Sequence, residues 1–204
     1  MRKTGTFLGD WWRLASPYFL RSDDRRLGVI LLITALALVL ASVWLEVLFN
    51  EWYGRFYDSL EKKDEPTFWR EIKVFTGLAF LFIFAGVARY IARPYLELRW
   101  RRWMTGHYLR HWLDGRGYYR IELERTIDNA DQRIADDLRL LTEYSTRLLL
   151  GLVSAIATLV SFLFILWTLS GPLSLKPIGI DFEIPGYMAW AALLYAIVDR
   201  KSVV

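Results

Sequence analysis

Residues 27–45 read LGVILLITALALVLASVWL, a run without a single charged side chain. As a helix, this run extends about 28 Å, close to the roughly 30 Å hydrocarbon core of a bilayer. It starts too far from the N-terminus, and is too long, for an ordinary cleaved signal peptide. The stretch therefore predicts a membrane-spanning helix.

Three further apolar blocks follow along the chain. The second reaches spanning length only if Lys73 and Arg89 extend their charged ends to the two interfaces. The fourth stops short at Asp199, and taken alone it would also fit a soluble core helix. Together the blocks predict an all-α, multi-spanning membrane protein with four spans at residues 27–49, 72–91, 148–169 and 184–198.

The composition excludes several classes of protein. The 204 residues are 54% hydrophobic and 24% charged, and the charges are confined between apolar blocks, which argues against a disordered chain. The absence of cysteine excludes a disulfide scaffold, a thiolate zinc site and a cysteine nucleophile. The sequence also lacks a phosphate-binding loop, a dinucleotide-binding glycine motif and an H-E-x-x-H zinc motif.

The basic residues between the blocks predict the orientation, because Lys and Arg are retained on the cytoplasmic side. Residues 89–147 contain 12 arginines, whereas the connection at 170–185 carries only Lys176. We expect the N-terminus and residues 89–147 in the cytoplasm. The basic charge is then a topology signal, and we expect no nucleic-acid partner.

Two segments continue the spans into water and predict a cytoplasmic helical hairpin at residues 92–147. One would carry the second span through Pro94, which we expect to kink the helix, as far as residue 113. Its apolar face would consist of Leu96, Trp100, Trp103, Met104, Tyr108 and Trp112. The other would begin after Asn129, an N-cap in Asn129-x-x-Gln132 with Asp131 in the first turn, and run unbroken into the third span. Its apolar residues recur at steps of three and four: Ile134, Leu138, Leu141, Tyr144 and Leu148. Opposite charges four apart support it: Arg133–Asp137, Arg139–Glu143 and Glu143–Arg147. The hairpin either packs only on itself or contacts a partner.

Residues 1–26 predict a cytoplasmic segment with a short amphipathic helix, whose length Pro17 limits. It would lie in the membrane interface or pack on the protein, with equal support for both. The residues on its apolar side are Phe7, Trp11, Leu14 and Tyr18.

Few side chains are candidates for chemistry. Glu46 lies near the end of the first span and fits a proton or substrate pathway, or a plain carboxylate at the outer interface. His107 and His111 are four apart but lack nearby carboxylates, which favours surface histidines over a metal site. We expect no catalytic, cofactor or metal residues.

Several motifs resemble one family of membrane domains. They are FNEWYGRFYDSL (49–60), LRWRRWMTGHYLRHWL (98–113), NADQRIADDLRLL (129–141) and the stretch from SGPLSL to IPGYMAWAALLYA. These are similar to the membrane domain of ABC transporters in the group of SbmA/BacA-like, YddA-type and peroxisomal acyl-CoA transporters. In that family the third motif usually reads Asn-Pro-Asp-Gln-Arg-Ile, so Ala130 replaces a proline here.

The resemblance implies a bundle of six membrane helices that works as a dimer, with an ATP-binding domain that uses ATP and Mg²⁺. It implies that Asn129, Asp131, Gln132 and Arg133 form the loop that couples the membrane domain to the ATP-binding domain. We therefore expect the permease part of an ATP-driven transporter in a bacterial inner membrane that assembles as a homodimer, with no ATPase site in these residues. The alternatives are a proton-driven peptide uptake protein of the SbmA/BacA-like kind and a non-transporting membrane scaffold. The substrate and the direction of transport are open.

The chain end predicts a truncated membrane domain. Residues 199–204, DRKSVV, break the apolar pattern of the fourth block. They back-translate to a sequence that, with a stop codon, reproduces the start of a common sequencing adapter. We expect these six residues to be an artefactual tail, and residues 27–198 to be the partial membrane domain.

Overall fold

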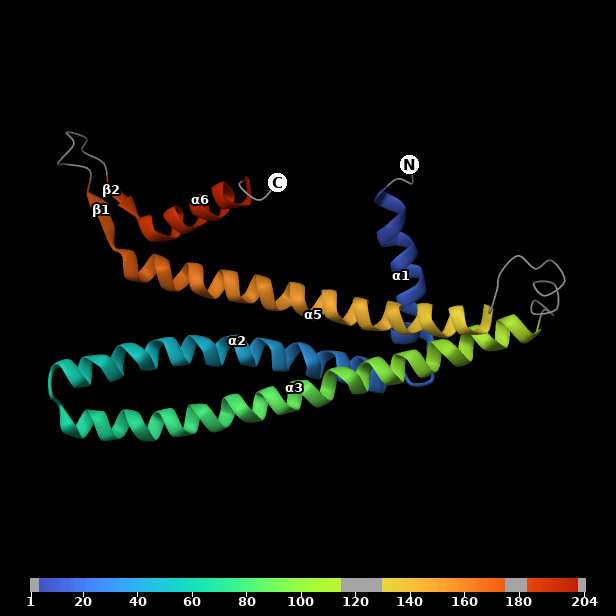
Figure 1. The fold of residues 1–204 in the computed structure, drawn as a ribbon, viewed down its shortest axis with the longest axis horizontal. Coiled ribbons are helices and arrows are strands. Elements are labelled where there is room, and N and C mark those ends of the chain that lie inside the picture. Colours follow the sequence, from blue (N-terminus) through green and yellow to red (C-terminus); the bar gives the residue numbers. More distant parts are fainter. Residues whose placement is uncertain (1–3, 115–129, 175–182, 202–204) are drawn as a thin grey trace. The chain divides into compact units, whose positions relative to one another are not determined.

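The computed structural model describes residues 4–114, 130–174 and 183–201, and it is helical apart from one small sheet (Figure 1). This confirms the predicted all-α class. The elements are α1 (Thr4–Arg21), α2 (Arg25–Glu61), α3 (Glu65–Asp114), α5 (Ala130–Ser170), β1 (Pro172–Ser174), β2 (Glu183–Pro185) and α6 (Tyr187–Lys201).

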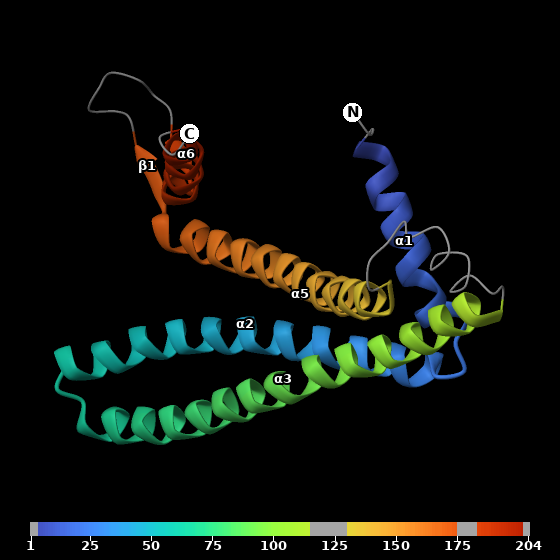
Figure 2. The ribbon, with the colours of Figure 1, turned by 45° about the vertical axis from the view of Figure 1, so that its right-hand side comes forward.

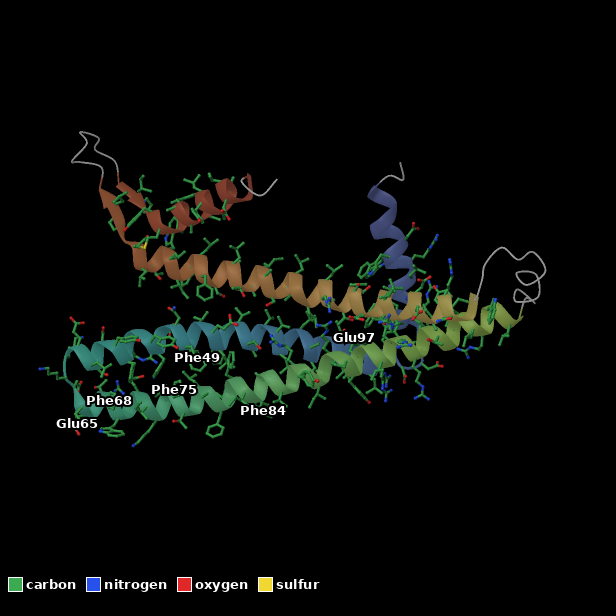
Figure 3. All side chains as sticks on the ribbon, viewed as in Figure 1. Phe49, Glu65, Phe68, Phe75, Phe84 and Glu97 are labelled. Carbon is green, nitrogen blue, oxygen red and sulfur yellow. The ribbon has the colours of Figure 1, made fainter. Side chains whose placement is uncertain are left out.

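Three of these helices, α2, α3 and α5, are long and apolar enough to cross a membrane. Their apolar stretches expose large side chains, such as Phe80 and Phe84, each 71% exposed, and Phe164, 68% exposed. Phe84 projects from α3 in Figure 3. Such exposure is unfavourable in water but not in lipid, so these faces fit a hydrocarbon environment.

The long helices run without interruption, as the hairpin prediction requires. Helix α3 has 50 residues and passes through Pro94, and α5 has 41 residues without a break. One prediction was incomplete: residues 50–73 are not a simple connection, because α2 continues to Glu61 and α3 already begins at Glu65. Both helices therefore extend beyond the expected spans at this end too.

The turn between α2 and α3 is short and fully hydrogen-bonded. Lys63 has a φ of 52°, and its N–H donates to Leu60 O while the N–H of Asp64 donates to Ser59 O. This is the Schellman arrangement that satisfies the last carbonyls of a helix. Asp64 then caps α3, because its Oδ1 accepts the N–H of Thr67 at 3.3 Å.

The chain divides into two compact units. The first comprises residues 1–42 and 79–153, and the second comprises residues 43–78 and 154–204. The core of the first unit consists of Ala15, Tyr18, Leu96, Trp100, Met104 and Leu138. These residues come from the helices labelled α1, α3 and α5 in Figure 2. A smaller cluster joins α2 to α5 through Ala35, Val39 and Leu150.

Helix α1 packs on the protein through one face, which includes Ala15 and Tyr18. Beside this face, Trp12 is 60% and Leu20 59% exposed, so part of α1 remains available to lipid. The expectation that Pro17 limits the helix was wrong, since α1 runs on to Arg21. Packing of Ala15 and Tyr18 on either side of the proline holds the helix together across the missing backbone hydrogen bond.

In the second unit, aromatic rings join α2 to α3 next to the turn. Trp52 lies 4.9 Å from Phe75 between ring centroids, Phe49 lies 6.2 Å from Phe75, and Phe56 lies 5.6 Å from Phe68. Phe49, Phe68 and Phe75 are labelled in Figure 3. These contacts explain why α2 and α3 stay helical here: each contributes aromatic residues at helical spacing to one shared layer.

The other part of the second unit is a turn at the end of α5. Strands β1 and β2 are antiparallel, with Leu173 opposite Ile184. The fourth predicted span, 184–198, started too early, because residues 183–185 are strand and the helix begins at Tyr187. Gly186 makes the change of direction with a φ of 64°. Helix α6 continues to Lys201, its apolar part being shorter than the other spans.

We expect Gly28→Ala to destabilise the first unit. A Cβ at position 28 would lie 2.8 Å from Cε1 of Tyr18, a ring that is completely buried. Because the ring has no free space, the substitution should cost about 1–3 kcal/mol of unfolding free energy. Thermal unfolding in detergent measures this, with Gly77→Ala as control, since no atom lies within 4 Å of a Cβ there. Equal midpoints for the two variants would contradict the close packing of Tyr18.

Asp64→Ala should loosen the first turn of α3. Hydrogen bonds from Thr67, its side chain first and its backbone second, lower the pKa of Asp64 below the ordinary 3.8. A lowered pKa means that the cap is fully present above pH 3.8 and is lost as the pH falls through the lower folded value. At neutral pH, the backbone amide protons of residues 65–68 should therefore exchange several-fold faster in Asp64→Ala than in the unmodified chain. Asp58→Ala, which removes only the Asp58–Lys62 ion pair, should leave these amides protected.

Candidate functional site

The candidate site is the end of the first unit where α3 and α5 extend beyond their spans. Ile134, Leu138 and Leu141 of α5 join the same core as Leu96 and Trp100 of α3. Side chains of the two extended segments thus pack together at the first turns of α5. On α3 the predicted apolar face is confirmed, since the core includes or contacts Leu96, Trp100, Trp103, Met104 and Tyr108.

Further along α5 the predicted apolar face was wrong. Tyr144 is 51% and Leu148 70% exposed, and Thr142, Ser145 and Thr146 are buried instead. Short polar residues can be buried on a helix because their hydroxyls donate to carbonyls of the preceding turn. Thr142 Oγ1 donates to Leu138 O at 3.0 Å, and Thr146 Oγ1 donates to Thr142 O at 2.8 Å.

Ser145 uses its hydroxyl differently and ties α1 to α5. The indole Nε1 of Trp11 donates to Ser145 Oγ at 2.7 Å. Together with Tyr18, this fixes α1 across both arms of the hairpin. We name the set of Trp11, Tyr18, Trp100, Leu138 and Ser145 the brace. Through these residues α1 contacts both α3 and α5 at this point.

The predicted coupling residues lie at the start of α5. Asn129 lies outside the described residues, and α5 begins at Ala130. Asp131 belongs to the first turn of α5, and Gln132 and Arg133 are exposed on it. The structure thus leaves the two described side chains of this motif accessible to a partner.

The ion pairs that follow the motif agree with the prediction in part. Arg139 contacts Glu143 at 3.6 Å, and Arg147 contacts Glu143 at 3.5 Å. Arg139 also reaches Asp136 at 3.8 Å. The predicted pair of Arg133 with Asp137 does not form within this described segment. Arg133 is exposed on α5 and has no ion-pair partner among the residues that the structure describes.

A basic groove of about 860 Å³ runs along α3, and sequence reasoning missed it. Arg99, Arg102 and Arg110 line it together with Asp24, Tyr95 and Trp103. Arg99 Nη1 lies 3.4 Å from Asp24 Oδ2, and its Nε donates to Tyr95 Oη at 3.3 Å. The bond to Tyr95, more than the charge of Asp24, raises the pKa of Arg99. The spacings of three and eight between the arginines were the available signal, because they place all three on one helix face.

Burial changes the acid–base behaviour of two tyrosines in the first unit. Burial first, and the carboxylate of Asp24 second, raise the pKa of Tyr18 above 10.0. Burial likewise raises the pKa of Tyr108, against the opposing charge of Arg13. Both phenols therefore stay neutral at physiological pH and contribute packing to the brace region.

The remaining candidates from the sequence are Glu46, His107 and His111. Glu46 is exposed on α2. The ring of His107 stacks on Trp103, with centroids 5.0 Å apart and an interplanar angle of 7°. The side chain of His111 lies outside the description, and the described residues contain no cluster of three or more potential metal ligands.

A buried carboxylate in the second unit was also missed. Glu71 is 2% exposed, and its oxygens lie 3.4 Å from Arg55 Nε and 3.3 Å from Arg70 Nη2. The Nε1 of Trp52 donates to the backbone oxygen of Glu71 at 2.8 Å. These contacts tie α2 to α3 near their turn. These contacts of Glu71 could not be predicted from the sequence, because an acidic residue in a charged connection normally faces water.

Ser145→Ala should weaken the brace. It leaves the indole N–H of Trp11 without its acceptor, which should cost about 1 kcal/mol of unfolding free energy. A double-mutant cycle with Trp11→Phe isolates the bond, since Ser145→Ala should cost almost nothing once the indole donor is gone. Thermal unfolding of the four proteins in detergent measures it. Additive effects of the two substitutions would show that the bond contributes no stability.

The chain was compared with known proteins. It matches the family described as ABC transporter transmembrane region 2 over residues 14–202. It is 32% identical over 187 residues to the inner membrane ABC transporter ATP-binding protein YddA of Escherichia coli, covering 90% of this chain and 33% of that protein. It is 37% identical over 170 residues to the chloroplastic ABC transporter D family member 2 of Arabidopsis thaliana, covering 81% of this chain and 23% of that protein.

A third relative, an ABC transporter ATP-binding protein of Haemophilus influenzae, is 29% identical over 189 residues, covering 92% of this chain and 31% of its own length. The chain thus spans a third or less of the length of these relatives. No solved structure matches it. The long apolar helices, their extended hairpin and the family match over residues 14–202 lead to one conclusion: the chain belongs to the ABC transporter transmembrane region 2 family and is a multi-pass membrane protein.

Proposed function

We propose that this chain is the permease part of an ATP-driven transporter that moves a solute across a bacterial inner membrane. The observation that carries the proposal is the continuity of α3 and α5. Each is a single helix from its membrane-spanning stretch to the hairpin end. A helix of 50 residues is about 75 Å long, and one of 41 residues about 60 Å. The bilayer core takes up only about 30 Å of either.

Such helices are suited to transmit force. An α-helix is rigid along its axis, so a push at the hairpin end reaches the membrane part without a loop that could absorb it. The brace adds to this, because the indole of Trp11 and the ring of Tyr18 fix α1 to both arms. Movement of the hairpin would then shift α1, α3 and α5 together.

The force would come from an ATP-binding domain. The relatives from Escherichia coli and Haemophilus influenzae are named as ABC transporter ATP-binding proteins. This chain matches only a third or less of the length of the three relatives. We propose that this domain, with ATP and Mg²⁺, acts on the hairpin, and that two such halves assemble as a homodimer with the N-terminus in the cytoplasm. The 12 arginines of residues 89–147 support this orientation.

The contact itself would lie at Asn129, Asp131, Gln132 and Arg133. Gln132 and Arg133 are exposed at the start of α5, and Arg133 lacks an ion pair with Asp137. An unpaired guanidinium and a neighbouring carboxylate offer charge pairing across an interface. Their role would be mechanical, with no catalytic step assigned to this chain.

Reversing both charges, Asp131→Arg with Arg133→Asp, should uncouple ATP hydrolysis from transport in the intact transporter. We expect substrate-stimulated ATPase activity and transport to fall at least tenfold, with normal expression and membrane insertion. The matched control reverses Asp136 and Arg139, an exposed pair further along the same helix. It should leave both activities near the original values.

A third variant separates coupling from helix capping. Asn129→Ala should cost about 0.5–2 kcal/mol of local helix stability if Asn129 is the N-cap, without reversing any charge. Unchanged stimulation and transport in the double reversal would reject the coupling role. Solute uptake that persists without ATP and follows the proton gradient would instead support a proton-driven transporter, and no solute movement at all would support a scaffold.

A further inference from the structure

A second cavity lies within the first unit, between α1 and the three long helices. It has a volume of about 160 Å³ and is lined by side chains that include Trp12, Phe19 and Leu20 of α1, Leu32 of α2, Trp100 of α3 and Leu149 of α5. An engineered apolar cavity of about 150 Å³ stays dry and takes up a small hydrocarbon. The size is thus sufficient for part of an apolar molecule.

The lining favours an apolar occupant over water. The hydroxyl of Ser145 accepts from Trp11, and that of Thr146 donates to Thr142 O, so these polar groups already have partners. A water molecule needs two to four polar partners to be stable in a cavity. The cavity offers it too few, whereas a hydrocarbon chain loses nothing there.

The position of the cavity points to a membrane lipid. Leu32 lies near the start of the uncharged stretch 27–45, and Leu149 near the start of 148–169. Trp100 follows the uncharged stretch 74–88 of α3. Leu32 and Leu149 therefore lie close to one boundary of the hydrocarbon core, and Trp100, 12 residues beyond Ala88, lies on the water side of this boundary. At the rim, Trp12 is 60% and Leu20 59% exposed, as expected for side chains that face lipid.

One polar group in the lining has no partner. The indole Nε1 of Trp100 has no hydrogen-bond acceptor among the described residues, although Trp100 is only 3% exposed. A buried donor without an acceptor is costly, and an acceptor brought by an occupant would remove that cost. In a phospholipid, the ester carbonyls lie at the boundary of the hydrocarbon core and are such acceptors.

We propose that this cavity, which we name the α1 cavity, holds the ester-linked beginning of one phospholipid acyl chain from the adjoining leaflet. The chain would fill the apolar space behind α1, and a small shift of the buried indole would let the ester carbonyl accept the N–H of Trp100. The site is independent of the proposed transport function, since it requires only that α1 and the spans meet a bilayer.

Photo-crosslinking tests the location. The full chain is reconstituted in phosphatidylcholine vesicles that contain an analogue with a diazirine near the ester end of one acyl chain. Mass spectrometry should find adducts concentrated in residues 11–20 and 96–100. Ser16→Phe fills the cavity, because Ser16 lines it, and should reduce these adducts several-fold. Ala37→Phe, at an exposed position of α2, is the control and should not. Adducts spread evenly over all lipid-facing segments, or unaffected by Ser16→Phe, would overturn the proposal.

A second experiment on the unmodified chain tests the carbonyl. Native mass spectrometry compares the retention of diester phosphatidylcholine with that of its diether analogue, which lacks the carbonyl. We expect several-fold better retention of the diester, and loss of this preference in Trp100→Phe. Trp103→Phe is the matched control, because Trp103 lies on the same helix and outside the lining, and it should keep the preference. Equal retention of both lipids by the unmodified chain would overturn the role of Trp100.

Discussion

The structure depends on one constraint: inside a bilayer, every backbone N–H and C=O must find its partner within the chain. A helix meets this requirement by itself, so the apolar stretches of α2, α3 and α5 are helical throughout. The same requirement explains the ends of these helices. The turn at residues 62–64 satisfies the last carbonyls of α2 and the first amides of α3 with hydrogen bonds to Ser59, Leu60 and Asp64. The chain thus reverses direction without leaving backbone groups unpaired.

Once the helices are continuous, their parts outside the membrane are positioned by side-chain packing. In the first unit the packing centres on Tyr18, which is completely buried and stacks against Trp100 with ring centroids 6.1 Å apart. Gly28 allows this, because no side chain separates the ring from the backbone of α2. Helix α1 therefore connects the two arms of the hairpin, although only a short turn separates it from α2. In the second unit, Trp52 and the buried Glu71 have the corresponding role between α2 and α3.

Polar side chains contribute more to these contacts than their number suggests. Thr142 and Thr146 are buried on α5 because each hydroxyl donates to a carbonyl of its own helix, while Ser145 accepts from Trp11. Small hydroxyl residues let helices approach closely where the surroundings supply no hydrophobic driving force. At the border of a membrane, close approach together with hydrogen bonds makes the contact between two helices specific. Leucine side chains would give only a nonspecific apolar contact there. Tyr144 shows the reverse of this burial pattern, because it is aromatic and yet exposed on the same helix.

The sequence by itself determined the fold class, the long helices and the hairpin, because uncharged runs of spanning length and helical periodicity are local properties. The core positions of α3 followed from the same periodicity. Only the tertiary structure decided which face of α5 turns inward after Leu141, since a buried threonine looks polar in a sequence until its hydrogen bond is seen. It also decided that Glu71 is buried and that Trp11 meets Ser145, because these contacts join residues that are distant in the chain. Such pairings depend on how helices pack, and no local pattern encodes them.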